Sequence, residues 1–395
     1  MNLLKKTVPF LAVVCAAVCA AGCNNKTYGL YTNMQDGFKV VDGSFKTELI
    51  EGYTPTERGG EAPDSTGYTT KGITYFSMYT DATVAVSDDF KEDTDKEKFA
   101  DFTTEEGKKF ISFTQAVKQQ LDHIDKSLST SVVNSDVSRF NAAAAGEKVQ
   151  ISKTAYEVIS EAKRIYEVTE GYYNPALYYN VLAYGFGDKH RVMTKEDLPA
   201  DELVAKYTDL SSHFGELQLI RDGETHYAVK PEYTVEAAGE TLTLHIDLSG
   251  IGKGYAVDKV EKLFNDYGYE FGYFSFGSSS MLVKRHLGGA YKLDLSNPRS
   301  SSRKPYVETE ILNEKLSTSG DNEQFYTIEG VRYCHVIDPT TGKPVQTGIM
   351  SVTVIGGSAA EDDALTTAIM AMGKEKAISF VKEKLNDRRV IFTVE

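Results

Sequence analysis

Only four cysteines occur in the sequence, and their positions leave no pair available for a disulfide framework. Cys15 and Cys19 lie in an N-terminal segment with the pattern of an export signal, and Cys23 ends that segment. Cys334 is then the single cysteine of the folded region. Because a disulfide needs two thiols, we expect a domain that is stabilised by its core rather than by covalent cross-links.

The sequence also lacks a basic cluster. Lys and Arg number 43 against 57 Asp and Glu, and the formal net charge is −14. Because nucleic-acid-binding surfaces need concentrated positive charge, this balance argues against nucleic acid as a partner. The length of 395 residues suits one large domain or two fused lobes with ample material for a core.

The N-terminal hydrophobic run is too short to span a membrane as a stable helix. It covers residues 8–18 and follows two lysines. A basic start, a short apolar run and small residues before a cysteine are typical of an export signal. Gly22 and Cys23 resemble the end of a lipobox, so we expect a signal peptide over 1–22 and lipid attachment at Cys23. The protein would then be extracytoplasmic and lipid-anchored; an ordinary secretory signal is the alternative.

The remainder divides into a polar segment and a long patterned region. Residues 23–71 are rich in Gly, Thr and Pro and lack a sustained period, which favours a tether from the membrane. Residues 72–395 mix helical and strand patterns, which predicts an α+β fold. Helices are expected over 113–128 and 152–166, and strands over 74–86, 271–276, 281–284, 291–295, 306–311 and 350–355.

A glycine-rich turn follows an alternating segment in the middle of the chain. Residues 242–247 alternate apolar and polar side chains, and residues 250–258 carry three glycines and Lys253 before a helical pattern. A strand-to-helix junction of this kind presents free backbone N–H groups and a lysine, which suits a polyphosphate. Many α/β proteins make the same turn without a ligand, so an ordinary loop is the alternative.

A second segment places a carboxylate and a hydroxyl on one helix face. Residues 358–361 form a capping-box pattern, which predicts that a helix starts after the strand 351–355. Asp363 and Thr367 are four residues apart within that helix. Their oxygens are ligands of the kind that Mg²⁺ accepts beside phosphate. The alternative is that Asp363 only stabilises the helix N-terminus.

A third segment contains a histidine that could transfer a proton. Residues 332–339 predict a strand that ends at a turn, with His335 between β-forming residues. An imidazole can act as a general base or contact a phosphate near neutral pH. A structural histidine is the alternative, and Cys334 is expected on the opposite face of the strand.

These segments occur in the order and approximate spacing of the FAD:protein FMN transferases, the ApbE-type flavin-trafficking lipoproteins, which the chain resembles from about residue 74 onwards. The resemblance rests on residues 134–141, 171–176, 184–187, 247–258, 317–321, 332–339 and 360–367. It implies a single ApbE-like, T-fold-related catalytic unit of mixed sheets and helices. It also implies transfer of the FMN moiety of FAD to a Thr or Ser hydroxyl of an exported acceptor protein, with Mg²⁺ as cofactor and release of AMP.

The resemblance assigns roles to individual residues. Asp363 and Thr367 would supply side-chain ligands to Mg²⁺ or Mn²⁺, and Gly250 a main-chain carbonyl. His335 is similar to the histidine that helps to deprotonate the acceptor hydroxyl. Contacts with FAD are expected at Met78, Tyr172, Tyr173, Asn174, Asp247, Lys253 and Ile337.

Some positions depart from the family pattern. Asn174 replaces an aspartate, Tyr184 replaces a tryptophan, and Ser131 falls where an aromatic residue often stacks on FAD. Two alternatives therefore stay open: a non-catalytic FAD-binding lipoprotein, and an Mg²⁺-dependent FAD pyrophosphatase that gives FMN and AMP. The family's acceptor signal resembles Ser/Thr-Gly-Ala-Ser/Thr, and the chain contains no such tetrapeptide, so we expect a separate acceptor protein.

Overall fold

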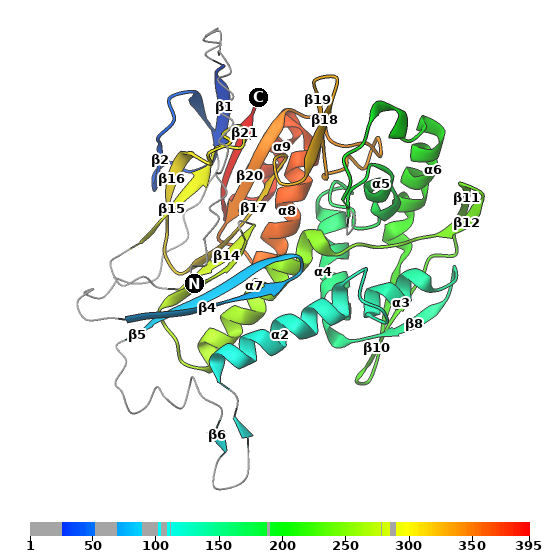
Figure 1. Cartoon of the computed structure of the whole chain (residues 1–395), viewed down its shortest axis with the longest axis horizontal. Helices are drawn as coiled ribbons and strands as arrows, with labels where there is room; N and C mark the ends of the chain where they lie inside the picture. The colour runs from blue at the N-terminus through cyan, green and yellow to red at the C-terminus, as the bar shows by residue number, and fades with distance from the viewer. Residues whose placement is uncertain are drawn as a thin grey trace, which may run out of the picture.

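A large mixed sheet forms the centre of the structure (Figure 1), a computed structural model that describes residues 26–51, 69–88, 102–103, 109–110, 112–187, 190–277, 279–284 and 290–395. Within these residues the sheet has nine strands, and only the outer pair β1 and β3 is parallel. The strands in spatial order are β3 (Phe45–Leu49), β1 (Tyr28–Thr32), β21 (Arg389–Val394), β20 (Ile349–Ile355), β17 (Glu314–Gly320), β14 (Ser280–Val283), β13 (Gly272–Phe276), β5 (Thr80–Asp88) and β4 (Thr69–Ser77).

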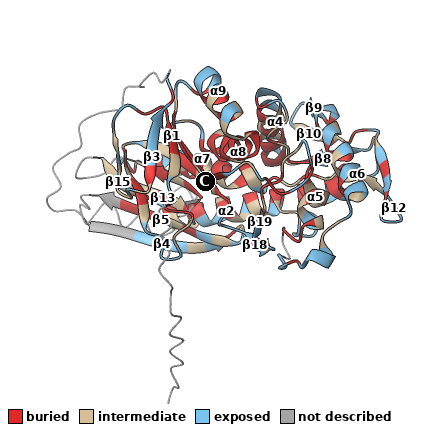
Figure 2. Cartoon of the chain, turned by 90° about the horizontal axis from the view of Figure 1, so that it is seen from above, coloured by how far each residue is buried: buried red, intermediate tan, exposed pale blue. Residues whose placement is uncertain are grey.

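Two helices pack directly on one face of this sheet. Helix α8 (Ala359–Met372) contacts β17 and β20, and helix α7 (Ser249–Asp266) contacts β13 and β14. Both are largely buried in the middle of the molecule (Figure 2), because α2 (Phe113–Leu128) and α4 (Lys153–Val168) cover them and α9 (Lys374–Lys384) continues from α8. The helices expected over 113–128 and from Ser152 are confirmed.

A second, three-stranded sheet covers the opposite face. It consists of β15 (Tyr291–Ser296), β16 (Pro305–Ile311) and β2 (Phe38–Val40). Leu295 and Val307 from this sheet share a buried cluster with Met350 and Ile391 of the central sheet. All seven residues of β20 are buried, as expected for a strand that is covered on both faces.

The remaining elements form a lobe beside α4 and α7 (Figure 1). It comprises α3 (Asp136–Ala142), β8 (Lys148–Ile151), α5 (Tyr178–Ala183), η1 (Lys195–Asp197), α6 (Asp201–Ser212), η2 (His213–Glu216), β9 (Gln218–Asp222), β10 (Thr225–Val229), β11 (Thr234–Ala237) and β12 (Glu240–Thr243). Strands β18 (Phe325–Ile328) and β19 (Val331–Cys334) form a hairpin, and Tyr326 of this hairpin packs against residues of the lobe. Strands β6 (Phe102–Thr103) and β7 (Lys109–Phe110) form a separate two-stranded pair. The mixture of sheets and helices confirms the predicted α+β class.

Part of the segment expected to be a tether is folded. Strands β1, β2 and β3 lie within residues 28–49, and β1 pairs with the last strand of the chain, Leu30 opposite Thr393. Leu30 and Phe45 are buried, which explains why this polar segment joins the sheet. Residues 1–25, with the expected signal and Cys23, lie outside the described residues. In the described part of the chain we find no helix with the length and apolarity needed to cross a membrane.

Three expected strands differ in extent, and the one expected over 332–339 already ends at Cys334. The pattern over 74–86 folds as a hairpin, because β4 ends at Ser77 and β5 begins at Thr80. The strand expected over 242–247 ends at Thr243. Beyond it Ile246 pairs with a side chain instead of a strand, since the Asn141 amide accepts from its N–H and donates to its carbonyl, both at 2.9 Å.

Candidate functional site

A cavity of about 430 Å³ lies between the start of α7, the middle of α8 and the second lobe. All eleven residues of the described chain to which the resemblance assigned a role line this one cavity. They are Met78, Tyr172, Tyr173, Asn174, Asp247, Gly250, Lys253, His335, Ile337, Asp363 and Thr367. These residues come from five separate segments, so the fold alone brings them together. Their individual roles remain predictions.

A close crossing holds α7 against α8. A Cβ at Gly254 in α7 would overlap the carbonyl oxygen of Ala359 in α8, so only glycine allows this approach. Asp258, one turn further along α7, accepts hydrogen bonds from the N–H groups of Ala359 and Ala360, at 2.9 and 3.0 Å. A carboxylate at a helix N-terminus satisfies exposed amides and complements the helix dipole. The start of α8 is therefore fixed against α7.

The capping pattern at the start of α8 is half realised. The Ser358 hydroxyl accepts from the Glu361 N–H at 3.3 Å, as the sequence predicted. The Glu361 carboxylate does not return to Ser358; it pairs with Arg388 and Arg164. A tertiary ion pair has replaced the local one, because both arginines reach the first turn of α8.

Asp363 is a buried carboxylate at the cavity wall. Its side chain is 3 % exposed, and Oδ2 accepts from the Gly254 N–H at 3.0 Å. Burial raises the pKa of Asp363, while the charge of Lys253 and the Gly254 N–H act in the opposite direction. No lysine or arginine of the described chain forms an ion pair with this carboxylate. A buried carboxylate that lines a cavity and has no ion-pair partner is stabilised when a cation binds in the cavity beside it.

The donor set around Asp363 fits a hard divalent cation. Thr367 lies one helical turn beyond Asp363, and its Oγ1 is 3.7 Å from the position of a Cβ at Gly250. Carboxylate, hydroxyl and main-chain carbonyl are all oxygen donors of the kind that Mg²⁺ accepts. Among the described residues no group of three or more His, Cys, Asp and Glu side chains could hold a metal alone. The ion would therefore share its coordination with oxygens of the ligand, as Mg²⁺ often does with phosphates.

Asp247 and Lys253 flank the first turn of α7. Asp247 Oδ1 accepts from the Ser249 N–H at 2.8 Å, and its own N–H donates to the Pro175 carbonyl at 2.8 Å. Lys253 is half-buried, and its charge lowers the pKa values of both His335 and Asp363. It therefore lies near both groups and places positive charge in the cavity, which suits the anionic ligand predicted from the sequence.

His335 follows β19 and reaches the cavity. Its N–H donates to the Gln324 carbonyl at 3.1 Å, and Nδ1 is buried without a hydrogen-bond partner among the described residues. Burial lowers the pKa of His335, helped by Lys253, so the ring is neutral near pH 7. Cys334, the last residue of β19, is 2 % exposed, lies in the core and is absent from the cavity lining, and burial raises its pKa to about 12.

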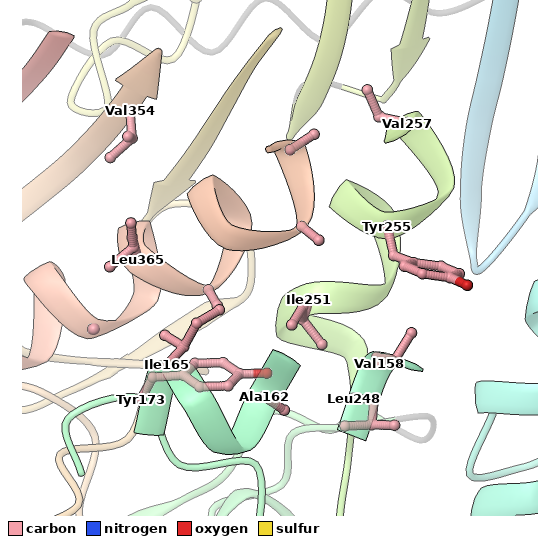
Figure 3. Close-up of a cluster of buried hydrophobic side chains, with 14 of the residues drawn as sticks. Val158, Ala162, Ile165, Tyr173, Leu248, Ile251, Tyr255, Val257, Val354 and Leu365 are labelled. Carbon is pink, nitrogen blue, oxygen red and sulfur yellow. The ribbon is translucent and has the colours of Figure 1, made fainter. Parts of the chain in front are cut away.

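The segment after α4 contributes two tyrosines and an amide. Tyr173 is 3 % exposed and lies in the same buried cluster as Ile165, Leu248 and Ile251 (Figure 3). The ring of Tyr172 faces the ammonium of Lys376, which lies 4.6 Å from the ring centroid. Both tyrosines line the cavity, Tyr173 from its floor.

Two other expected FAD contacts are engaged within the protein. The amide of Asn174 donates to the Ser211 carbonyl at 3.1 Å and accepts from the Ala176 N–H at 2.9 Å, so it shapes its own loop. Ile337 is buried beside Leu177, which leaves it a packing role at the cavity edge.

The sequence reasoning missed several cavity residues. They include Tyr79, Asp125, His190 and Glu323. The negative charge of Glu323 acts to raise the pKa values of both His335 and Asp363, so this carboxylate lies near both groups. At His335 it opposes the larger effect of burial. It lies in a turn without a recognisable motif, and only its proximity to residues 317–321 hinted at a role. Tyr79 had a better signal, because it adjoins Met78.

Comparison with known proteins agrees with these features. A family model described as the ApbE family matches residues 78–392. Proteins named FAD:protein FMN transferase from Vibrio cholerae and Klebsiella pneumoniae are each 30 % identical, over 67 % and 68 % of this chain and 74 % and 73 % of their own lengths. The solved structure titled Flavin Transferase ApbE from Vibrio cholerae superposes with a TM-score of 0.65 at 25 % identity, covering 83 % of this chain and 94 % of that one.

Proposed function

The chain belongs to the ApbE family, and on that premise we propose that it is an FAD:protein FMN transferase that flavinylates an exported acceptor protein. The observation that carries the proposal is the convergence of all eleven residues of the family pattern on one cavity. A pure FAD-binding protein would have no need of a proton acceptor and a metal-binding oxygen set beside the same ligand.

The reaction would form one bond and break another at phosphorus. The acceptor hydroxyl oxygen bonds to the phosphorus of the FMN phosphate, the pyrophosphate P–O bond to AMP breaks, and AMP leaves with the electron pair. His335 would take the hydroxyl proton on Nε2, because Nδ1 is buried and the ring is neutral. Lys253 would bind the pyrophosphate and hold it in line for attack.

A magnesium ion fits the same residues. Asp363, Thr367 and the Gly250 carbonyl would hold it, and Mn²⁺ would fit the same oxygen donors. When bound, the ion offsets the negative charge of the pyrophosphate and of the leaving AMP. The Gly254 N–H, which donates to Asp363 Oδ2, would keep the carboxylate in place for this role.

A direct assay separates the transferase from its alternatives. The purified full chain is incubated with FAD, Mg²⁺ and a peptide that carries a Ser/Thr-Gly-Ala-Ser/Thr sequence, and the peptide mass and released nucleotides are measured. We expect the peptide to gain the mass of FMN less one water, with one AMP for each adduct. FMN and AMP without an adduct would identify a pyrophosphatase, and unchanged bound FAD a binding protein; either result contradicts the proposal.

We also propose that a lipid on Cys23 anchors the protein outside the cytoplasm. The support is the signal-like segment 1–22, which ends at Gly22 directly before Cys23. Cys23→Ser should then move the protein from the membrane fraction to the soluble fraction, because a lipidated cysteine would be the anchor. Cys19→Ser is the matched control and should leave the protein on the membrane. Membrane association of Cys23→Ser in high salt would contradict the proposal.

A further inference from the structure

The tip of the β4–β5 hairpin is a strained turn at the cavity mouth. Ser77 pairs with Thr80, so only Met78 and Tyr79 form the loop. Both residues have positive φ values, 45° and 63°. Two-residue hairpin loops of this kind usually carry Asn-Gly, because a side chain is disfavoured in the left-handed region. Two bulky residues in such a turn indicate that at least one of these side chains has a functional role that offsets the backbone strain.

The Tyr79 ring lies beside the cavity and is largely exposed. Its side chain is 63 % exposed and lines the cavity, so packing into the core does not explain the strain. Its hydroxyl is hydrogen-bonded to the hydroxyl of Ser131, in the loop after α2. Ser131 in turn bonds to Ser129 Oγ at 3.2 Å, and Ser129 lines the cavity. The Tyr79 side chain thus links the hairpin to the loop after α2 beside the cavity.

The hairpin is held in place from other sides as well. The Gly277 N–H donates to the Asp81 carbonyl at 2.7 Å, and a Cβ at Gly277 would lie only 2.6 Å from Thr80 Oγ1. The Tyr75 hydroxyl donates to the Thr114 carbonyl at 2.7 Å, which ties β4 to the start of α2. The ring is therefore positioned before any ligand arrives, and this lowers the entropy cost of binding.

We propose that the Tyr79 ring stacks on a planar heteroaromatic ring of the bound flavin dinucleotide and closes the cavity mouth over it. The inference rests on the proposed function, which supplies the ligand. Flavin and adenine both present a flat π face, and a tyrosine ring with a tethered hydroxyl offers a matching one. The hairpin would thereby provide the stacking that a serine at position 131 cannot.

Three variants test this assignment. Tyr79→Gly removes the ring and relieves the positive φ, so the unfolding temperature of the free protein should not fall while FAD binds about 5- to 100-fold more weakly. Tyr79→Phe keeps the ring and should bind FAD within about 3-fold of the parent chain. Phe76→Ala is the matched control, because Phe76 is an aromatic residue of the same hairpin, 74 % exposed and outside the cavity lining; it should leave FAD affinity unchanged.

Titration with FMN and with ADP identifies the stacked ring. A loss confined to FMN, with brighter fluorescence of the bound flavin, assigns the stack to isoalloxazine, and a loss confined to ADP assigns it to adenine; both support the inference. Unchanged FAD affinity in Tyr79→Gly would overturn it, and so would an equal loss in Tyr79→Phe, which would assign the effect to the hydroxyl. A parent chain that fails to bind FAD would instead contradict the proposed function.

Discussion

Asp363→Asn should abolish Mg²⁺-dependent FMN transfer without lowering the stability of the metal-free protein. The amide oxygen of asparagine can still accept from the Gly254 N–H, so the local geometry survives. The variant loses the charge that holds the cation, and electrostatic stabilisation by a metal is worth several kcal/mol, which corresponds to about 100-fold or more in rate. Burial disfavours the charged form of Asp363. The neutral asparagine therefore avoids the cost of removing a charge from water when the metal-free protein folds. Transfer rate against Mg²⁺ concentration and thermal unfolding measure the two effects.

The neighbouring carboxylate gives the matched control. Asp362 is fully buried, accepts from the Gly357 N–H at 3.0 Å and pairs with Arg388 at 3.0 Å. Asp362→Asn removes the charge that pairs with Arg388, which keeps Glu361 as a partner, so we expect a loss of about 1–3 kcal/mol of unfolding free energy. The dependence of the transfer rate on Mg²⁺ concentration should not change in the protein that remains folded. The two substitutions thus have opposite signatures on adjacent residues. Transfer at the parental rate in Asp363→Asn, or a loss of stability like that of Asp362→Asn, would show that the metal assignment is wrong.

Local patterns explain why so much of the candidate site was predictable. Asp363 and Thr367 are related by helical spacing, and the glycine-rich segment is visible within ten residues. The structure corrects the expected turn, because α7 begins at Ser249 and the three glycines lie within its first two turns. What joins these segments is not local. Asp258 caps a helix about 100 residues further along, and Gly254 is required by the backbone of Ala359 rather than by its own turn. Neither contact leaves a trace in the spacing of residues along the chain.

The fold shows the same limit at the N-terminus. β1 pairs with β21 at the other end of the chain, and the polar segment around Leu30 becomes a strand only because that edge is available. The turn at Met78 and Tyr79 could not be recognised, since neither residue is typical of a two-residue hairpin loop. Asn174 matched a ligand-binding segment, but both ends of its amide bind the protein. A motif identifies a segment, and only packing decides where each side chain points.

His335→Ala should reduce FMN transfer far more than FAD binding. Assistance by a general base is worth about 10²–10⁴-fold in rate, whereas one neutral hydrogen bond to bound FAD is worth about 0.5–1.5 kcal/mol, or roughly 2- to 12-fold in affinity. Burial lowers the pKa of His335, so the neutral base persists below pH 6.5 and the transfer rate should begin to fall only under that pH. The alanine variant has no imidazole to protonate, so its residual transfer rate should not show this fall at low pH (the acid limb of the pH profile). Single-turnover rates between pH 4.5 and 8, with FAD titrations at each pH, measure both effects.

Cys334→Ala is the control for the adjacent position. Cys334 packs in the core on the other side of the segment, and its thiol is unreactive because burial raises its pKa to about 12. This substitution should cost about 1 kcal/mol of unfolding free energy and leave transfer rate, FAD affinity and the acid limb unchanged. If His335→Ala weakens binding and transfer equally, the histidine is a ligand contact and not the base. If Cys334→Ala slows transfer as strongly, neither residue has the role that the geometry indicates, since the thiol does not reach the cavity.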